Sequence, residues 1–311
     1  MYGNFGAALG AVAPADPTDD APVPNRPAAT TERRTKARRT GQTIRWAAVP
    51  TSDDYDGFLI DLDGVVWLGR EPVPGSPEAL ATMLAAGKEI VFVTNNPSKR
   101  PEEYAERLAG MGVEVGPERI VTAGIVTAKL AAEAAPGGAA LVLGFEPLKE
   151  LVAGEGLRLV DFDEPTEAAV VVVSGWRDFD YMSLLAAKRA LDAGAALVAT
   201  SHDATMPMPG GEWPGTGAIL AAVEVASGKK AEIAGKPEHH LFELALSRMN
   251  GAKRVAMIGD RLSSDIAGGQ AAGLDTILVL SGTSGSGGGS EDPATSDVKP
   301  TLTVANLAAL V

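Results

Sequence analysis

The sequence predicts an α/β protein built on a parallel sheet, and two patterns lead to this prediction. From residue 55 onward, short apolar runs alternate with stretches of helical periodicity, as in strands joined by helical crossovers. The runs are nearly continuous in apolar residues, as expected for strands that are buried on both faces. With 311 residues, the chain is long enough for one large domain or two ordinary ones.

The expected elements follow in order along the chain. Apolar runs predict buried strands at residues 58–60, 90–93, 140–143, 168–173, 197–199, 255–258 and 276–280. Helical patterns predict helices at residues 77–86, 101–111, 181–193, 237–249 and 264–272, and a closing helix at about 304–310. The Gly/Ser-rich stretch 281–290 predicts a flexible loop.

Residues 125–231 have the features of a unit of their own. They contain at least three strand signals and their own helices, and the polar motifs described below lie on either side of them. An insertion that returns the chain to the first sheet is the simplest explanation, and two tandem domains are the alternative. The prediction is therefore a core formed by residues 51–124 and 232–311, with an insertion at 125–231.

Residues 1–50 are predicted to be a disordered tail. They are rich in Ala, Pro, Thr and Asp and lack periodicity, so they cannot bury enough apolar surface to order themselves. A basic run from Arg33 to Arg39 could act as an anion-binding arm. A solvated tail is the simpler interpretation, and we assign the tail no function.

The composition limits the classes of function. The chain has no cysteine and only three histidines, so any bound metal is expected to have oxygen ligands. The net charge is −13; residues 1–45 sum to +3, which leaves −16 for the remainder, and such a body repels nucleic-acid phosphates. No apolar run reaches the roughly 20 residues of a membrane span, and no secretory signal is evident. We expect a cytoplasmic protein without nucleic-acid or membrane partners.

Asp61 and Asp63, which directly follow the first apolar run, are the most informative residues. Open α/β sheets bind ligands outside the carboxyl ends of their strands. Two carboxylates there need compensating charge, which a metal cation supplies, and a carboxylate is also a nucleophile toward phosphorus. The pair alone is a weak signal, because strand ends often carry an Asp as a turn or cap residue.

Two further segments place polar groups where they could meet this pair. Thr94, Asn95 and Asn96 follow the second apolar run, where a hydroxyl and main-chain N–H groups can donate to phosphoryl oxygens; Thr94 alone could equally be a helix N-cap. Lys236 directly precedes Pro237, which we expect in the first turn of a helix. A lysine held there brings positive charge to phosphate or to a carboxylate cluster.

Asp260 and Asp265 complete the set. Asp260 ends the run 255–258 after a glycine, and Asp265 follows on the next expected helix. Asp260 is predicted to be a metal ligand, and Asp265 could orient it or neutralise Lys236 from behind. Alone, Asp265 could be an acid favoured by the helix dipole. Together these strand ends supply a nucleophile, a second acid, a hydroxyl, a lysine and a metal-binding carboxylate.

On these residues the chain resembles the haloacid dehalogenase superfamily of phosphotransferases. More narrowly it resembles subfamily IIA, the branch of NagD-like nucleotidases, phosphoglycolate and glycerol-phosphate phosphatases and 4-nitrophenyl phosphatases. The resemblance extends from about residue 55 to the end of the chain. The matching stretches are Asp61-Leu62-Asp63-Gly64-Val65, Thr94-Asn95-Asn96, Gly235-Lys236-Pro237 and Gly259-Asp260-Arg261-Leu262-Ser263-Ser264-Asp265.

The resemblance implies a Rossmann-like, doubly wound parallel-sheet core with an inserted α/β cap domain of the C2 type that closes over the site. The stretch 199–204 departs from the Thr-Asn-x-Asp pattern common in this branch, with Ser201 and His202 where Asn and often Pro stand. This departure weakens any transfer of substrate identity. His202 could reach the substrate from the cap, although a plain loop histidine is the simpler interpretation. Caps of this type also imply a possible homodimer.

The main hypothesis is a Mg²⁺-dependent phosphatase for a small phosphate ester such as glycerol phosphate, phosphoglycolate, a sugar phosphate or a nucleoside monophosphate. Asp61 attacks phosphorus and forms an aspartyl-phosphate, and Asp63 is the general acid and then the base. Mg²⁺ is held by the carboxylates of Asp61 and Asp260 and by the main-chain carbonyl of Asp63. The phosphate-binding residues are expected to be Thr94, Asn95, Asn96 and Lys236.

Two other classes of function remain open at this point. A phospho-accepting signalling domain also combines an Asp nucleophile, acidic metal ligands, a Thr and a Lys, but the inserted unit and the acid at position 63 count against it. A non-catalytic small-molecule binding protein is disfavoured, because every chemical residue is present. A phosphotransferase or mutase shares the same chemistry, and the physiological substrate and oligomeric state cannot be inferred from the sequence.

Overall fold

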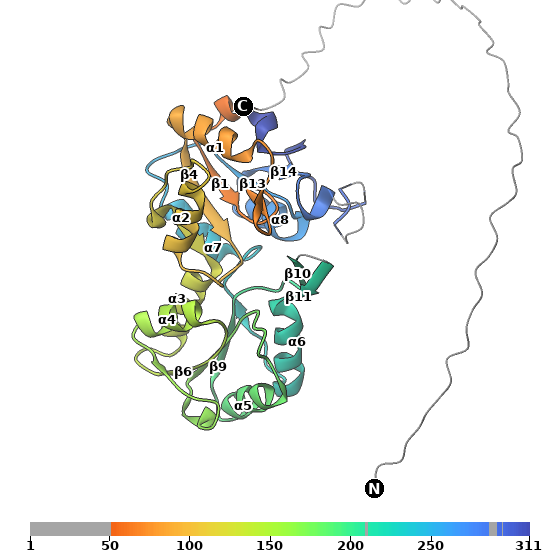
Figure 1. The fold of residues 1–311 in the computed structure, drawn as a ribbon. Helices are drawn as coiled ribbons and strands as arrows, with labels where there is room; N and C mark the ends of the chain where they lie inside the picture. Colours follow the sequence, from red (N-terminus) through yellow and green to blue (C-terminus); the bar gives the residue numbers. More distant parts are fainter. Residues whose placement is uncertain (1–50, 209–210, 286–290, 294) are drawn as a thin grey trace, which may run out of the picture. The chain divides into compact units, whose positions relative to one another are not determined.

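The computed structural model describes residues 51–208, 211–285, 291–293 and 295–311 of the chain (Figure 1). The tail predicted at residues 1–50 and the stretch 286–290 of the predicted flexible loop lie outside these ranges. The described residues belong to one unit of contacts, Ala48–Val311, which contains two parallel sheets. The parallel α/β class predicted from the apolar runs is confirmed.

The first sheet has six strands, and all of its strand pairs are parallel. In spatial order its strands are β15 (Leu302–Val304), β14 (Asp275–Val279), β13 (Val255–Gly259), β1 (Gly57–Asp61), β4 (Glu89–Thr94) and β5 (Ile120–Thr122). The chain builds from β1 toward β5 on one side and later returns to add β13, β14 and β15 on the other. This reversal beside β1 is the switch point at which such sheets bind ligands.

Helices cover both faces of the first sheet (Figure 1). Successive residues of β1 point to opposite faces, so Phe58 and Ile60 join one apolar cluster and Leu59 joins the other. The helices in the first cluster are α1 (Ser76–Ala85), α2 (Pro101–Ala109) and the 3₁₀-helix η6 (Leu307–Leu310). Those in the second that pack on this sheet are α3 (Ala123–Ala134) and α7 (His239–Ser247).

The second sheet is formed by residues between 139 and 233 and is also parallel. In spatial order its strands are β12 (Glu232–Ile233), β9 (Ala196–Ala199), β8 (Val170–Val173), β6 (Ala139–Leu143) and β7 (Arg158–Leu159). One face packs on α3 and α4 (Glu146–Gly154), and the other on α5 (Tyr181–Asp192) and α6 (Thr216–Ser227). Two antiparallel hairpins pair β2 (Trp67–Leu68) with β3 (Glu71–Pro72) and β10 (Thr205–Met208) with β11 (Gly211–Pro214).

One apolar cluster reaches both sheets through α3. It contains Leu59 and Met257 of the first sheet, Val142 and Val172 of the second, and Leu130 of α3. The expected boundary at residue 125 therefore falls inside a helix that packs on both sides. The division into a core and an insertion at 125–231 stays a prediction.

The remaining elements are short. They are the 3₁₀-helices η1 (Ser52–Asp54), η2 (Pro117–Arg119), η3 (Pro165–Glu167) and η5 (Thr283–Gly285), a π-helical turn at Leu262–Ile266, and α8 (Ala267–Ala271). Across the described ranges, no helix combines the length and the apolar character needed to cross a membrane.

Several expected elements differ from the structure. Of the closing helix expected at 304–310, Val304 belongs to the strand β15 and Leu307–Leu310 form a single 3₁₀ turn, because Leu302–Val304 extend the sheet beside β14. The helix expected to include Pro237 begins only at His239, since Glu238 has an extended backbone and is the N-cap. The strand expected from residue 168 starts at Val170, after a 3₁₀ turn.

The helix expected at 264–272 is divided in two. Main-chain N–H groups of Asp265 and Ile266 both donate to the carbonyl of Arg261, which widens the first turn into a π-helical one. The α-helical hydrogen-bond pattern starts at Ala267. The wide turn lies directly after Asp260, at the carboxyl edge of the first sheet.

We expect Phe242→Ala to lower the free energy of unfolding by about 3–5 kcal/mol, measured by urea denaturation. Phe242 is 1% exposed in the cluster that joins both sheets, and its ring fills the space that Gly268 leaves by having no side chain. Val225→Ala is the control, because Val225 is 86% exposed, and it should change stability by no more than about 0.5 kcal/mol. Equal effects of the two substitutions would contradict the assigned core.

Candidate active site

The polar groups predicted at strand ends meet at one edge of the first sheet. Asp61 is the last residue of β1, Thr94 is the last residue of β4, and Asp260 directly follows β13. Strands β4 and β13 flank β1, and all three are parallel, so their carboxyl ends share an edge. The edge coincides with the reversal of chain direction described above.

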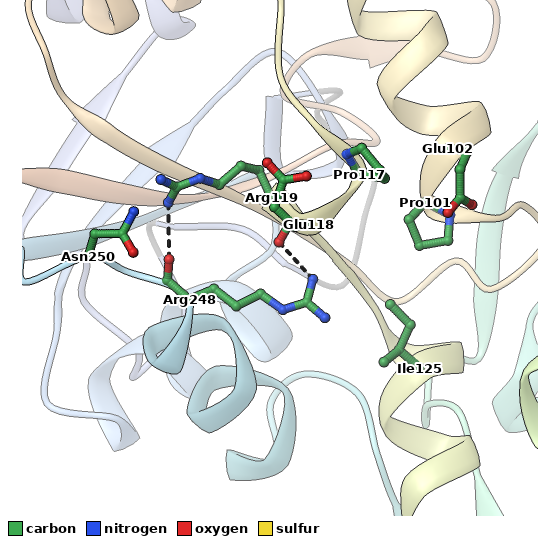
Figure 2. Close-up of a pocket in the computed structure, with 8 residues that line it drawn as sticks. All are labelled: Pro101, Glu102, Pro117, Glu118, Arg119, Ile125, Arg248 and Asn250. Carbon is green, nitrogen blue, oxygen red and sulfur yellow. Dashed lines mark hydrogen bonds between the residues drawn. The ribbon is translucent and has the colours of Figure 1, made fainter. Parts of the chain in front are cut away.

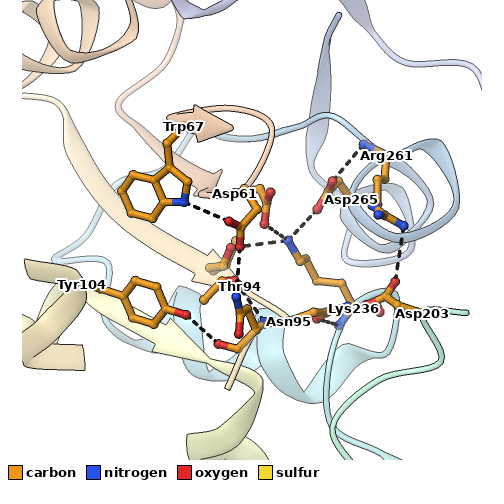
Figure 3. Close-up of polar contacts among 12 residues, drawn as sticks. Asp61, Trp67, Thr94, Asn95, Tyr104, Asp203, Lys236, Arg261 and Asp265 are labelled. Carbon is orange, nitrogen blue, oxygen red and sulfur yellow. Dashed lines mark hydrogen bonds and ion pairs between the residues drawn. The ribbon is translucent and has the colours of Figure 1, made fainter. Parts of the chain in front are cut away.

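Lys236 is the cation at the centre of this edge (Figure 3). Its Nζ lies 2.5 Å from Oδ1 of Asp61 and 2.6 Å from Oδ1 of Asp265. All three residues are buried. Burial disfavours a charged lysine, but the attraction of Asp265 and Asp61 outweighs it and raises the pKa of Lys236 above its ordinary value. Lys236 is therefore charged at neutral pH.

The buried acids outnumber this lysine. Asp61, Asp260 and Asp265 offer carboxylate oxygens within 4.8 Å of one another, and Lys236 is the sole buried lysine or arginine in the described part of the chain. Burial, together with the charges of Asp265 and Asp260, raises the pKa of Asp61 well above its usual range despite Lys236. Burial and Asp265 likewise raise the pKa of Asp260 to about 6. The site thus lacks positive charge.

A hard divalent cation fits this deficit. The donors are carboxylate oxygens, which Mg²⁺ prefers, and three buried carboxylates share one buried lysine. Gly64 has a φ of +89°, and a Cβ there would overlap the carboxylate of Asp260. The glycine of the motif thus lets the chain pass close to the acidic cluster.

Asp63 lies outside the acidic cluster, and its carboxylate has other partners. Trp67 Nε1 donates to Oδ1 of Asp63 at 2.9 Å, and Asn96 Nδ2 lies 3.5 Å from Oδ2. Asp63 also lines the cavity described below. Its carboxylate is therefore available for proton transfer rather than occupied within the cluster.

Asn95 holds Lys236 in place. Its Oδ1 accepts from the main-chain N–H of Lys236 at 2.8 Å, and its Nδ2 donates to the carbonyl of Lys236 at 3.0 Å. The same Nδ2 donates to Oδ2 of Asp203 at 2.9 Å. The amide of Asn95 is thus fully engaged. The buried Thr94 accepts from the N–H of Asn96 at 3.1 Å and keeps its own hydroxyl hydrogen available.

A cavity of about 530 Å³ opens over these residues. Asp61, Asp63, Thr94 and Lys236 line its floor, and the segment after β9 contributes Ser201, Asp203, Thr205 and Met206. Nη1 of Arg261 lies 3.9 Å from Oδ1 of Asp203. His202 is exposed and does not line this cavity, although the residues on either side of it do.

A larger cavity, of about 630 Å³, lies elsewhere (Figure 2). Its two arginines donate to main-chain carbonyls: Arg119 to that of Arg248, and Arg248 to those of Glu118 and Ile120. Arg119 also pairs with Glu89 at 2.7 Å. These two arginines connect separate segments of the main chain through hydrogen bonds. None of the predicted catalytic, phosphate-binding or metal-binding residues lines this cavity, so the smaller cavity is the candidate active site.

Sequence reasoning missed three contacts of this site. The contact of Trp67 with Asp63 was not predicted, although a buried indole N–H normally finds an acceptor and Asp63 stands four positions before it. The bond between Asn95 and Asp203 joins residues that are 108 positions apart, and no local pattern indicates it. Arg261 follows Asp260 directly, but its approach to Asp203 depends on the same long-range contact.

Comparison with known proteins gives two family matches. A family model described as haloacid dehalogenase-like hydrolase matches residues 58–158, and a HAD-hydrolase-like model matches residues 233–310. Together the matches include every site residue predicted from the core, from Asp61 to Asp265.

Individual relatives and solved structures agree with these matches. The chain is 39% identical to D-glycerol 3-phosphate phosphatase of Mycobacterium tuberculosis over 74% of this chain and 64% of that protein. It is 38% identical to rat chronophin (Rattus norvegicus), over 73% of this chain and 77% of that protein. The crystal structure of the M. tuberculosis glycerol phosphate phosphatase with magnesium matches with a TM-score of 0.73 and 34% identity, over 83% of this chain and 77% of that one.

We expect Mg²⁺ to raise the melting temperature of the protein by about 5–10 °C at a concentration of 100 Kd, because the ion offsets buried negative charge in the folded state alone. Differential scanning fluorimetry with and without EDTA measures this shift. Asp260→Asn should lose most of it. Glu133→Gln, which removes an exposed acid on α3, should keep it. An undiminished Mg²⁺ response in Asp260→Asn would rule out this residue as a ligand.

Proposed function

The chain belongs to the haloacid dehalogenase-like hydrolases and is a Mg²⁺-dependent phosphatase of that family; we propose that Asp61 is its nucleophile. The observation that carries this proposal is the position of Asp61, at the end of the central strand, on the floor of the cavity and 2.5 Å from the buried Lys236. Attack by one carboxylate oxygen on phosphorus forms an aspartyl-phosphate and releases the alcohol.

Asp63 is proposed as the general acid and base. It protonates the departing alkoxide and then removes a proton from the water that cleaves the aspartyl-phosphate. Its carboxylate lines the same cavity as Asp61 but lies outside the buried acidic cluster. The same carboxylate can therefore act as the acid in the first half-reaction and as the base in the second, because both take place in this cavity.

Thr94 and Lys236 are proposed to bind the phosphoryl oxygens. Both line the cavity floor, Thr94 with an available hydroxyl hydrogen and Lys236 with a full positive charge. Asn96 was predicted with them, and its Nδ2 lies 3.5 Å from Oδ2 of Asp63. We assign Asn95 a positioning role, because its amide already bonds to both main-chain groups of Lys236.

Mg²⁺ is proposed to be held by Asp61, Asp260 and the main-chain carbonyl of Asp63. When bound, it offsets the repulsion between the carboxylate nucleophile and the anionic phosphate. Asp265 is proposed to interact with Lys236 and Arg261. Its Oδ1 lies 2.6 Å from Nζ of Lys236, and its Oδ2 accepts from the main-chain N–H of Arg261 at 3.0 Å. In that role it fixes the lysine rather than touching the substrate.

The substrate is proposed to be a small phosphorylated metabolite of the glycerol phosphate class. This assignment is supported by the similarity to D-glycerol 3-phosphate phosphatase. Residues 125–231 are proposed to be the cap, since Ser201, Asp203, Thr205 and Met206 contribute to the cavity wall. A substrate contact of His202, a homodimer through the cap and a cytoplasmic location stay predictions.

Asp61→Asn should lower kcat for 4-nitrophenyl phosphate by at least about 10³-fold with Mg²⁺ present, because the amide is not a nucleophile. Continuous release of 4-nitrophenolate measures it. Asp53→Asn is the matched control, since Asp53 is exposed near the start of the same domain, and it should keep full activity. Appreciable turnover by Asp61→Asn would exclude the assignment.

A panel of phosphate esters tests the substrate class. Glycerol 3-phosphate, phosphoglycolate, a hexose phosphate and AMP are compared by phosphate release, each with Mg²⁺ and with EDTA. We expect glycerol 3-phosphate to have the highest kcat/KM and every activity to be lost in EDTA. A preference of tenfold or more for AMP or the hexose phosphate would replace the proposed class without affecting the chemistry.

A further inference from the structure

Trp67 is the one indole that touches the catalytic carboxylates within the described residues. It is fully buried, and its Nε1 donates to Oδ1 of Asp63 at 2.9 Å. The local main chain fixes this approach: the N–H of Gly64 donates to the carbonyl of Trp67 at 2.7 Å, and the N–H of Val66 donates to that of Leu62 at 2.9 Å. The five-residue loop from Asp63 to Trp67 thus returns the indole onto the acid that begins it.

Helix α2 holds the indole ring from the side. Tyr104 is stacked parallel to it, with ring centroids 6.3 Å apart and an interplanar angle of 2°, and the guanidinium of Arg107 lies 3.8 Å from the ring centroid. Arg107 is itself fixed by a 2.7 Å hydrogen bond to the carbonyl of Gly69. Figure 3 shows Trp67 and Tyr104 beside the catalytic residues. The ring has little freedom to turn its N–H away from Asp63.

We propose that Trp67 is a positioning residue that dedicates Oδ1 of Asp63 to the indole and leaves Oδ2 as the oxygen that transfers protons. The inference rests on the proposed acid–base role of Asp63. An indole N–H is a donor only, so Oδ1 is fixed as an acceptor. Oδ2 is left for exchange with the substrate, since its own contact, with Asn96, is long, at 3.5 Å.

The proton movements follow from this arrangement. In the first half-reaction, the bond from phosphorus to the ester oxygen breaks as the bond to Asp61 forms, and the proton on Oδ2 of Asp63 passes to the leaving oxygen. In the second, water attacks phosphorus, the bond to Asp61 breaks, and the water proton returns to Oδ2. Trp67 gives up no proton in either step and keeps the carboxylate in one orientation.

A packing role of Trp67 alone explains less of the observed geometry than the positioning role does. Burial and stacking explain why an aromatic side chain occupies position 67, and any nearby carbonyl could then satisfy the N–H. The acceptor is instead the carboxylate two residues from the nucleophile, and it belongs to a residue that lines the cavity. The two interpretations differ in what the loss of the N–H does to each half-reaction.

The test compares leaving groups in Trp67→Phe, which keeps an aromatic ring but lacks the N–H. Release of 4-nitrophenolate needs no general acid, whereas release of glycerol as an alkoxide does. We expect stopped-flow measurements with 4-nitrophenyl phosphate to show a rapid burst of about one product per site, followed by slowed turnover. With glycerol 3-phosphate, single-turnover cleavage should fall about 10- to 100-fold, with KM changed less than about twofold.

Two controls separate the outcomes. Trp176→Phe removes an indole that stacks on Phe162 at 5.5 Å and does not line the cavity, so it should leave both substrates unaffected. Placing 3-benzothienylalanine at position 67 keeps the bicyclic shape, and its sulfur replaces the N–H; it should reproduce the Trp67→Phe result if that variant folds poorly. Equal losses with both substrates and no burst, or full activity of the benzothienyl variant, would overturn the positioning role. Absence of turnover in the unsubstituted enzyme would instead refute the proposed function.

Discussion

The pairing of one buried lysine with several buried carboxylates is the constraint on which the rest of the site depends. Unpaired charges are costly to bury, so Asp61, Asp260 and Asp265 could not share this edge of the sheet without Lys236. The lysine offsets only part of their charge, and the remaining deficit makes the site selective for a cation. The site is expected to bind a phosphate only when that cation is present, because the body of the protein is strongly acidic and repels an anion.

The main chain sets the geometry of this charge cluster. Parallel strands β4, β1 and β13 bring Thr94, Asp61 and Asp260 to one edge, while Asn95 grips both main-chain groups of Lys236. The π-helical turn after Asp260 points Asp265 back toward the lysine. Because each charged group is carried by a strand end or a bonded loop, the site is largely preorganised before a ligand arrives.

The sequence allowed the sheet and the charged floor of the site to be predicted, because strand ends follow directly from where an apolar run stops. Asp61 and Asp260 are of this kind, whereas Lys236 was predicted from its place before Pro237, at the expected start of a helix. The contacts of Asp203 were not predicted, since they depend on which loop approaches which strand across distant parts of the chain. The contact of Trp67 with Asp63 spans only four positions, but it depends on the conformation of the loop that returns the indole to the acid. Local signals also failed at the end of the chain: residues 304–310 have helical periodicity, yet pairing with β14 draws Leu302–Val304 into the sheet.

Asp203 has a consequence for attempts to redesign this enzyme for other esters. It lines the substrate cavity, yet its Oδ2 also accepts from the amide that holds Lys236. A library that varies this position would alter turnover and preference together, and selection could not separate the two. Phe145, Thr205 and Met206 line the same cavity without a hydrogen bond to the lysine loop among the contacts of the described residues. They are the positions at which ester preference can be engineered independently of the chemistry.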